Sequence, residues 1–184
     1  MLLSVVSAPA ALASQTTIQG PESRVQLVEL FTSEGCSSCP RADATLLDLE
    51  SHPDLWRTFA PVGLHVDYWD RLGWRDRFAT VRNGQRQRNY ARAGLASGAY
   101  TPGWFVGGQE WRGENRGRTL NHAFVAMSQA QAEFVSGTGV LELPEANNED
   151  VPTRRAVVAW VTRADNPVPL QAVGGWPPTP PRCC

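Results

Sequence analysis

The sequence of 184 residues contains no lysine, because all 17 of its basic residues are arginine. No side chain can therefore form a Schiff base with a carbonyl substrate, and no ammonium group can lower the pKa of a nearby thiol. The net charge is only -1 and no glycine-rich phosphate-binding motif occurs, so nothing directs the chain to nucleic acid or to anionic membranes. Hydrophobic residues make up 42% of the chain, which is enough for one domain with a core of its own.

Long apolar runs are scarce as well. Residues 1–13 are apolar or small apart from two serines, and they end in a small-x-small pattern of the kind that signal peptidase cuts. This run is too short to cross a membrane. We expect residues 1–14 to be a signal peptide or a disordered N-terminus, and the protein to be exported to the periplasm or secreted, without stable membrane insertion. Disulfides persist in such compartments.

Only four cysteines are present, and two of them, Cys36 and Cys39, form a Cys-x-x-Cys motif. The preceding residues 24–31 are mostly apolar and predict a central strand, whereas good helix formers follow from Pro40 to Ser51. A proline is tolerated in the first turn of a helix. The motif therefore lies where a strand passes into a helix, and the unpaired N–H groups and dipole of that helix favour a thiolate at Cys36.

Three interpretations compete for this pair: a redox-active dithiol, half of a zinc site, or a structural disulfide. Structural zinc needs further cysteine or histidine ligands, and the three histidines are scattered. A disulfide this short closes almost no loop, so it would stabilise little. We favour the dithiol, in which Cys36 attacks a partner, Cys39 resolves the mixed disulfide, and Ser37 and Ser38 donate to the sulfur. We expect thiols and disulfides of proteins or small molecules as partners, and no cofactor.

The following residues predict how the sheet continues. Residues 54–60 are expected to form a short connecting helix, and residues 62–69 a second strand parallel to the first, which would bring Asp67 near the cysteines. The arginine-rich residues 72–95 predict an inserted helix with Thr80 as its N-cap and Gly94 as its stop. Its arginines are expected on a solvated face rather than in an anion-binding surface.

Thr101 and Pro102 lead into two short apolar segments, residues 103–106 and 109–112, that flank Gly-Gly and predict a hairpin. A cis bond before Pro102 would present backbone groups to an extended substrate peptide. Further on, residues 115–134 show the spacing of an amphipathic helix. Residues 135–165 are expected to add a strand around residues 156–161, and the proline-rich tail 166–184 to be extended or disordered.

Together, these motifs resemble the thioredoxin superfold and, more closely, an exported bacterial thioredoxin-like family known as the domain-of-unknown-function 1223 family. The residues that carry the resemblance are Val28 to Pro40, His65 to Asp70, Gly73-Trp74, Gln85 to Gln87 and Tyr100 to Pro102. The resemblance covers about residues 24–113. It implies an α/β fold, namely a thioredoxin-like three-layer α/β/α sandwich over residues 24–134 with an inserted helical segment and a short C-terminal β portion, together with redox chemistry.

The chain departs from these relatives in several places. The family usually continues into a longer β-rich portion, whereas this chain ends in a proline-rich stretch and Cys183-Cys184, for which we expect a truncated or frame-shifted end and free thiols. Two serines replace the Gly-Pro that thioredoxins have between their cysteines. Glu29 lies one residue further back than the buried acid of thioredoxins, so a proton acceptor and a salt-bridged glutamate both remain open for it.

Two alternative functions are kept. Cys36, Cys39 and His65, with Asp67 on the same strand face, could form a copper or zinc site, which would make the protein a metal-binding or metal-delivery module. The chain could also be a thioredoxin-like adaptor that binds peptides without turnover. Four tryptophans, at positions 69, 74, 104 and 111, are expected either to pack in the core or to line a groove beside the thiols.

Overall fold

The computed structural model describes residues 19–112 and 156–177. Within them lies a four-stranded mixed sheet in the order β2-β1-β3-β4. Its strands are β1 (Gln26–Thr32), β2 (Phe59–His65), β3 (Gly103–Val106) and β4 (Gln109–Trp111). β1 pairs in parallel with β2 and antiparallel with β3, so the α/β class expected from the sequence is confirmed.

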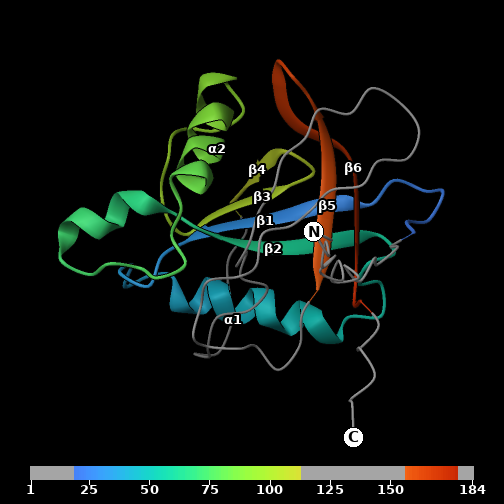
Figure 1. Ribbon diagram of the computed structural model, residues 1–184, viewed down its shortest axis with the longest axis horizontal. Coiled ribbons are helices and arrows are strands. Elements are labelled where there is room, and N and C mark those ends of the chain that lie inside the picture. The colour runs from blue at the N-terminus through green and yellow to red at the C-terminus, as the bar shows by residue number, and fades with distance from the viewer. Residues whose placement is uncertain (1–18, 113–155, 178–184) are drawn as a thin grey trace, which may run out of the picture.

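Helices and a second, two-stranded sheet complete the described part. The helices are α1 (Pro40–Asp48), α2 (Val81–Arg92) and the short 3-10 segments η1 (Leu49–Ser51) and η2 (Asp67–Leu72). The second sheet is an antiparallel hairpin of β5 (Val157–Arg163) and β6 (Asn166–Gly175). Figure 1 shows α1 on one side of the four-stranded sheet, with α2 and the β5–β6 hairpin on the other.

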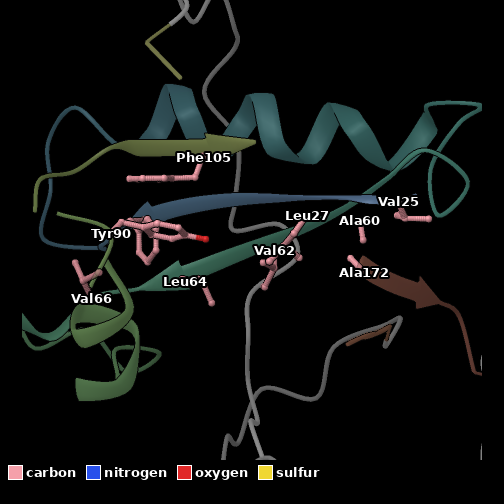
Figure 2. Packing of buried hydrophobic residues seen from close by; sticks show 10 residues of the cluster. Val25, Leu27, Ala60, Val62, Leu64, Val66, Tyr90, Phe105 and Ala172 are labelled. Carbon is pink, nitrogen blue, oxygen red and sulfur yellow. The ribbon is translucent and has the colours of Figure 1, made fainter. Parts of the chain in front are cut away.

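Alternation along β1 supplies one apolar cluster to each face of the sheet. Val28 and Leu30 pack with Leu46 of α1 on one face. Leu27 and Phe31 point to the other face, where they join the larger cluster drawn in Figure 2. That cluster draws residues from both sheets and α2: Val25, Ala60, Val62, Leu64, Val66, Tyr90, Phe105 and Ala172. Because β1 is covered on both faces, its near-continuous apolar sequence is explained.

Several predicted boundaries hold. The hairpin of β3 and β4 turns at Gly107 and Gly108, with φ values of 57° and 85°. Two successive positive φ values favour glycine at both positions, as in a type I′ turn. Thr80 is the N-cap of α2 and accepts a hydrogen bond from the backbone N–H of Asn83 at 3.2 Å, as predicted. Gly94 has a φ of 71° just beyond the end of the helix.

Two predictions of local structure need correction. Residues 54–58 form turns rather than a helix, and the second strand is β2 (Phe59–His65) rather than residues 62–69, because residues 67–72 form η2. Residues 166–175 of the proline-rich tail are extended, as expected, and pair with β5 as strand β6. Pro169 lies where the pairing of β5 with β6 shifts register, so the prolines occupy the irregular part of the ladder and the apolar residues beyond them pair regularly.

Other predictions concern residues outside the described ranges. These are the N-terminal segment 1–14, the amphipathic helix 115–134 and the terminal Cys183-Cys184. Among the residues that the structure describes, no helix has the length and apolar character needed to cross a membrane.

Candidate functional site

The Cys-x-x-Cys motif joins β1 to α1, as the sequence predicts. Cys36 and Cys39 form a disulfide whose Cα atoms lie 5.4 Å apart. Cys39 is the N-cap residue of α1, and its carbonyl oxygen accepts the N–H groups of Ala42 and Asp43 at 2.8 and 3.0 Å. Pro40 occupies the first turn. The disulfide therefore lies at the end of the helix where the dipole is positive.

The two serines between the cysteines are both exposed, whereas the cysteines are not. The Ser38 hydroxyl lies 3.4 Å from the Cys36 sulfur, and because a disulfide sulfur carries no hydrogen, the hydroxyl is the donor. Cys36 is 2% exposed and Cys39 is 0% exposed. The sulfurs are thus bonded to each other, but solvent reaches almost none of their surface.

The loop before Cys36 is held by a buried carboxylate that the sequence analysis did not single out. Asp76 Oδ2 accepts the backbone N–H of Glu34 at 2.8 Å and lies 2.6 Å from His65 Nδ1. Its second oxygen, Oδ1, accepts the N–H of Phe78 at 2.8 Å. Asp76 is 3% exposed and His65 is 1% exposed. The only sequence signal was an acidic residue isolated between Arg75 and Arg77.

This environment makes Asp76 a carboxylate. Burial alone would raise its pKa, but the hydrogen bond and charge of His65, with the N–H groups of Glu34 and Phe78, outweigh burial and hold the pKa below its ordinary value of 3.8. The loop that carries the cysteine pair is therefore attached to an ionised group.

We expect the hydrogen bonds of Asp76 to make the free energy of unfolding decrease as the pH falls. A carboxyl whose pKa is lower in the folded state stabilises the fold above its unfolded-state pKa, and that contribution is lost as pH falls through the folded-state value. Asp76→Asn should remove this contribution. Urea unfolding of both proteins at pH 6, 4 and 3 should show the stability gap between wild type and variant narrowing as pH falls. A gap that stays constant would contradict the prediction.

Pro102 begins the neighbouring part of the site. The Thr101-Pro102 bond is cis, as the sequence analysis expected. The next residue, Gly103, pairs with Phe31 near the C-terminal end of β1, the end from which the cysteine loop departs. The Thr101 hydroxyl accepts a hydrogen bond from the Trp69 indole N–H at 2.7 Å. The C-terminal end of β1, η2 and the start of β3 thus meet at one end of the sheet.

Gln87 of α2 also supports this loop and was quoted in the sequence only as part of a motif. Its side-chain N–H donates to the carbonyl oxygen of Tyr100 at 2.6 Å, and its oxygen accepts from the Tyr68 hydroxyl at 2.9 Å. Gln87 is completely buried. Because both ends of the Gln87 amide are hydrogen-bonded, this side chain holds the backbone at Tyr100, directly before Thr101.

Glu29 does not join the cysteines. It is completely buried on the sheet face opposite α1, where Arg86 Nε lies 2.6 Å from its Oε1 and the Tyr90 hydroxyl donates to its Oε2 at 2.6 Å. Burial and the Glu29 charge raise the pKa of Tyr90. Of the two roles left open for Glu29, the geometry favours the salt-bridged glutamate.

Asp67 and His65 are engaged by other side chains. The Asp67 carboxylate is 4.0 Å from Arg88 of α2, and Gly84 makes room for it, since a Cβ there would lie 2.2 Å from Asp67 Oδ1. Within residues 19–112 and 156–177, no group of three or more histidine, cysteine or acidic residues is placed to hold a metal ion. The described residues therefore give no support to the metal alternative built on Cys36, Cys39 and His65.

The four tryptophans divide between core and surface. Trp104 is 5% exposed and belongs to the α1-side cluster, and Trp69 packs against the larger cluster. Trp74 and Trp111 are 61% and 44% exposed. The Trp74 indole N–H donates to Glu34 Oε2 at 3.2 Å, which places an exposed aromatic side chain next to the cysteine loop. Core packing thus holds for Trp104 and Trp69, whereas Trp74 and Trp111 lie at the surface.

Comparison with known proteins extends over the same part of the chain. Residues 27–112 match the model of a family described as "Protein of unknown function (DUF1223)", which supports that family for this region. A crystal structure of a protein from Agrobacterium tumefaciens, solved by structural genomics, is 41% identical over 47% of this chain, with a TM-score of 0.40. The alignment spans 38% of that protein's chain. No curated protein matches.

Proposed function

We propose that this protein is an exported thiol–disulfide oxidoreductase of thioredoxin type. The observation that carries the proposal is the disulfide between Cys36 and Cys39 at the N-terminus of α1. A thiolate formed there upon reduction is favoured by the helix dipole and the N-terminal N–H groups, and the Ser38 hydroxyl lies beside the Cys36 sulfur. The parallel β1–β2 pair and the β3–β4 hairpin that follows Pro102 are consistent with a thioredoxin-like sandwich.

The reaction exchanges two electrons without a cofactor. In one direction, the Cys36 thiolate attacks a partner disulfide, so a mixed disulfide forms and one partner thiolate leaves. The Cys39 thiolate then attacks the Cys36 sulfur. The Cys36–Cys39 bond forms and the second partner sulfur departs as a thiolate, which takes up a proton. In the reverse direction, a partner dithiol reduces the disulfide that the structure contains.

Export is part of the proposal. The apolar residues 1–13 with their small-x-small ending support it, since a secreted protein reaches a compartment where a disulfide persists. Fusing residues 1–20 to a reporter that is active only outside the cytoplasm would test it. Reporter activity is the expected result.

We expect Cys36→Ser to abolish exchange, because Cys39 alone is completely buried and cannot form the first mixed disulfide. Turnover would be measured as reduction of insulin with dithiothreitol as donor and as reactivation of scrambled ribonuclease. Ser51→Ala, which changes an exposed serine beyond the far end of α1, is the control and should retain turnover. Equal rates for wild type and Cys36→Ser would remove Cys36 from the mechanism.

One observation favours a second candidate, the adaptor without turnover. Cys36 is 2% exposed, whereas a partner sulfur must reach it for exchange. In an adaptor the disulfide would serve only to fix the loop. Wild type with no turnover in either assay, but with retained peptide binding, would identify the adaptor.

A further inference from the structure

Residues 73–78 form neither helix nor strand and pack against the loop that precedes Cys36. Together with Leu72, the last residue of η2, we name them the cover segment. A Cβ built on Gly35 would lie 3.7 Å from both the Cβ and the carbonyl oxygen of Trp74, so the backbone of the segment touches the loop. Figure 1 shows the connection from β2 to α2 and the connection from β1 to α1 at the same end of the sheet.

Three residues of the cover segment contact Glu34 in this loop. The Trp74 indole donates to the Glu34 carboxylate at 3.2 Å, and Arg77 Nε lies 3.5 Å from its other oxygen. The Glu34 backbone N–H donates to Asp76 at 2.8 Å. Glu34 is two residues before Cys36, so the segment holds the chain that leads directly to the reactive sulfur.

These contacts differ in burial. The side chain of Arg77 is 55% exposed and Trp74 is 61% exposed, so solvent competes for both. Leu72 is 62% exposed and contributes little apolar burial. Asp76 and Phe78 are the buried residues of the segment. His65 and the Phe78 N–H anchor the Asp76 carboxylate, and the Phe78 ring meets the His65 ring edge-on with centroids 5.3 Å apart. Residues 72–75, which are exposed and add little apolar burial, belong to the low-stability end of a structure, and the segment is anchored at Asp76 and Phe78.

We propose that the cover segment opens and closes over the redox pair and that Asp76 is the latch that sets how often Cys36 is reachable. This inference rests on the proposed function, since it describes the regulation of the same site. It reconciles a reactive disulfide with a Cys36 exposure of 2%. In the open state, an attacking thiolate bonds to the Cys36 sulfur and Cys39 leaves as a thiolate, which completes the first half of the exchange.

The test is the rate at which dithiothreitol reduces the Cys36–Cys39 disulfide in the folded protein, followed by alkylation and mass measurement. Asp76→Asn weakens a charge-assisted buried hydrogen bond, so we expect reduction to be about tenfold faster. Val25→Ala truncates a buried residue near the other end of β1 and is the control for general destabilisation. It should lower the melting temperature without accelerating reduction. Equal rates for Asp76→Asn and wild type, or equal acceleration in Val25→Ala, would overturn the proposal.

A second measurement needs no variant. The Glu34 amide hydrogen is bonded to Asp76, so its exchange with deuterium reports opening of the cover segment in the wild-type protein. We expect it to exchange at least tenfold faster than the amide of Leu30 in the central strand, which opens with global unfolding. Equal protection of the two amides would show that the cover segment does not open on its own.

The outcomes separate this inference from the proposed function. Faster chemical reduction of Asp76→Asn in a protein that turns over neither insulin nor ribonuclease would support the latch and refute the oxidoreductase. Turnover that depends on Cys36, with reduction unaffected by Asp76→Asn, would support the oxidoreductase and refute the latch.

Discussion

Arg86→Met is expected to lower the free energy of unfolding by about 3–5 kcal/mol, because it leaves a buried carboxylate without its counter-charge. Arg86 donates from Nε and NH2 to the two oxygens of Glu29 at 2.6 and 3.2 Å. Glu29 is 0% exposed, and the Arg86 side chain is 16% exposed. Its guanidinium also lies 5.1 Å from the ring centroid of Trp160 in β5, so one side chain joins the central strand, α2 and the C-terminal hairpin.

Urea unfolding would measure this loss. The double variant Glu29→Gln/Arg86→Met is the control, because it removes both charges and keeps an acceptor for the Tyr90 hydroxyl. We expect it to be more stable than Arg86→Met alone, since the cost of the single variant is mainly that of an uncompensated buried charge. If the stability losses of Glu29→Gln and Arg86→Met, measured separately, added up to the loss of the double variant, the ion pair would have no coupling energy.

Phe105→Ala is expected to cost about 3–5 kcal/mol of unfolding free energy. Phe105 of β3 is completely buried. Its ring stacks on Tyr90 with centroids 4.5 Å apart and meets Phe31 edge-on at 5.4 Å. Truncation would leave a cavity between the sheet and α2, at the middle of β1, where Phe105 pairs with Glu29. Figure 2 shows Phe105 and Tyr90 facing each other.

Thermal and urea unfolding would check this result. Phe105→Leu preserves most of the apolar volume and should cost clearly less, because the cavity is smaller even though the ring contacts are lost. Equal losses for the leucine and alanine variants would place the stabilisation in the aromatic contacts rather than in the filled volume.

Local patterns were sufficient for the strand–cysteine–helix unit. Apolar continuity predicted β1, helix formers after Pro40 predicted α1, and Gly107-Gly108 predicted the hairpin. Each of these features depends on residues a few positions apart, which sequence spacing expresses directly. The predicted helix over residues 54–60 failed because Phe59 and Ala60 pair with β1, and tertiary pairing overrides local propensity.

The network behind the cysteines could not be predicted in the same way. His65 and Asp76 are 11 residues apart, and Glu34 and Asp76 are 42 apart, so no local spacing connects them. The partner of Glu29 was equally hidden, because Arg86 appeared only as one cation in a run expected to face solvent. Contacts between elements depend on how the elements pack, which a single sequence does not state.

The two faces of the central strand are completed at different times while the chain is being synthesised. Among residues 19–112 and 156–177, every member of the α1-side cluster precedes residue 107, so this part of that face can close early. The opposite face includes Ala172, whose N–H donates to the carbonyl oxygen of Val25 at 3.3 Å. Leu27 and Val62 beside it thus await a segment that leaves the ribosome more than 100 residues after β1. Nascent chains of this protein therefore present a one-sided apolar surface that a holdase chaperone can protect.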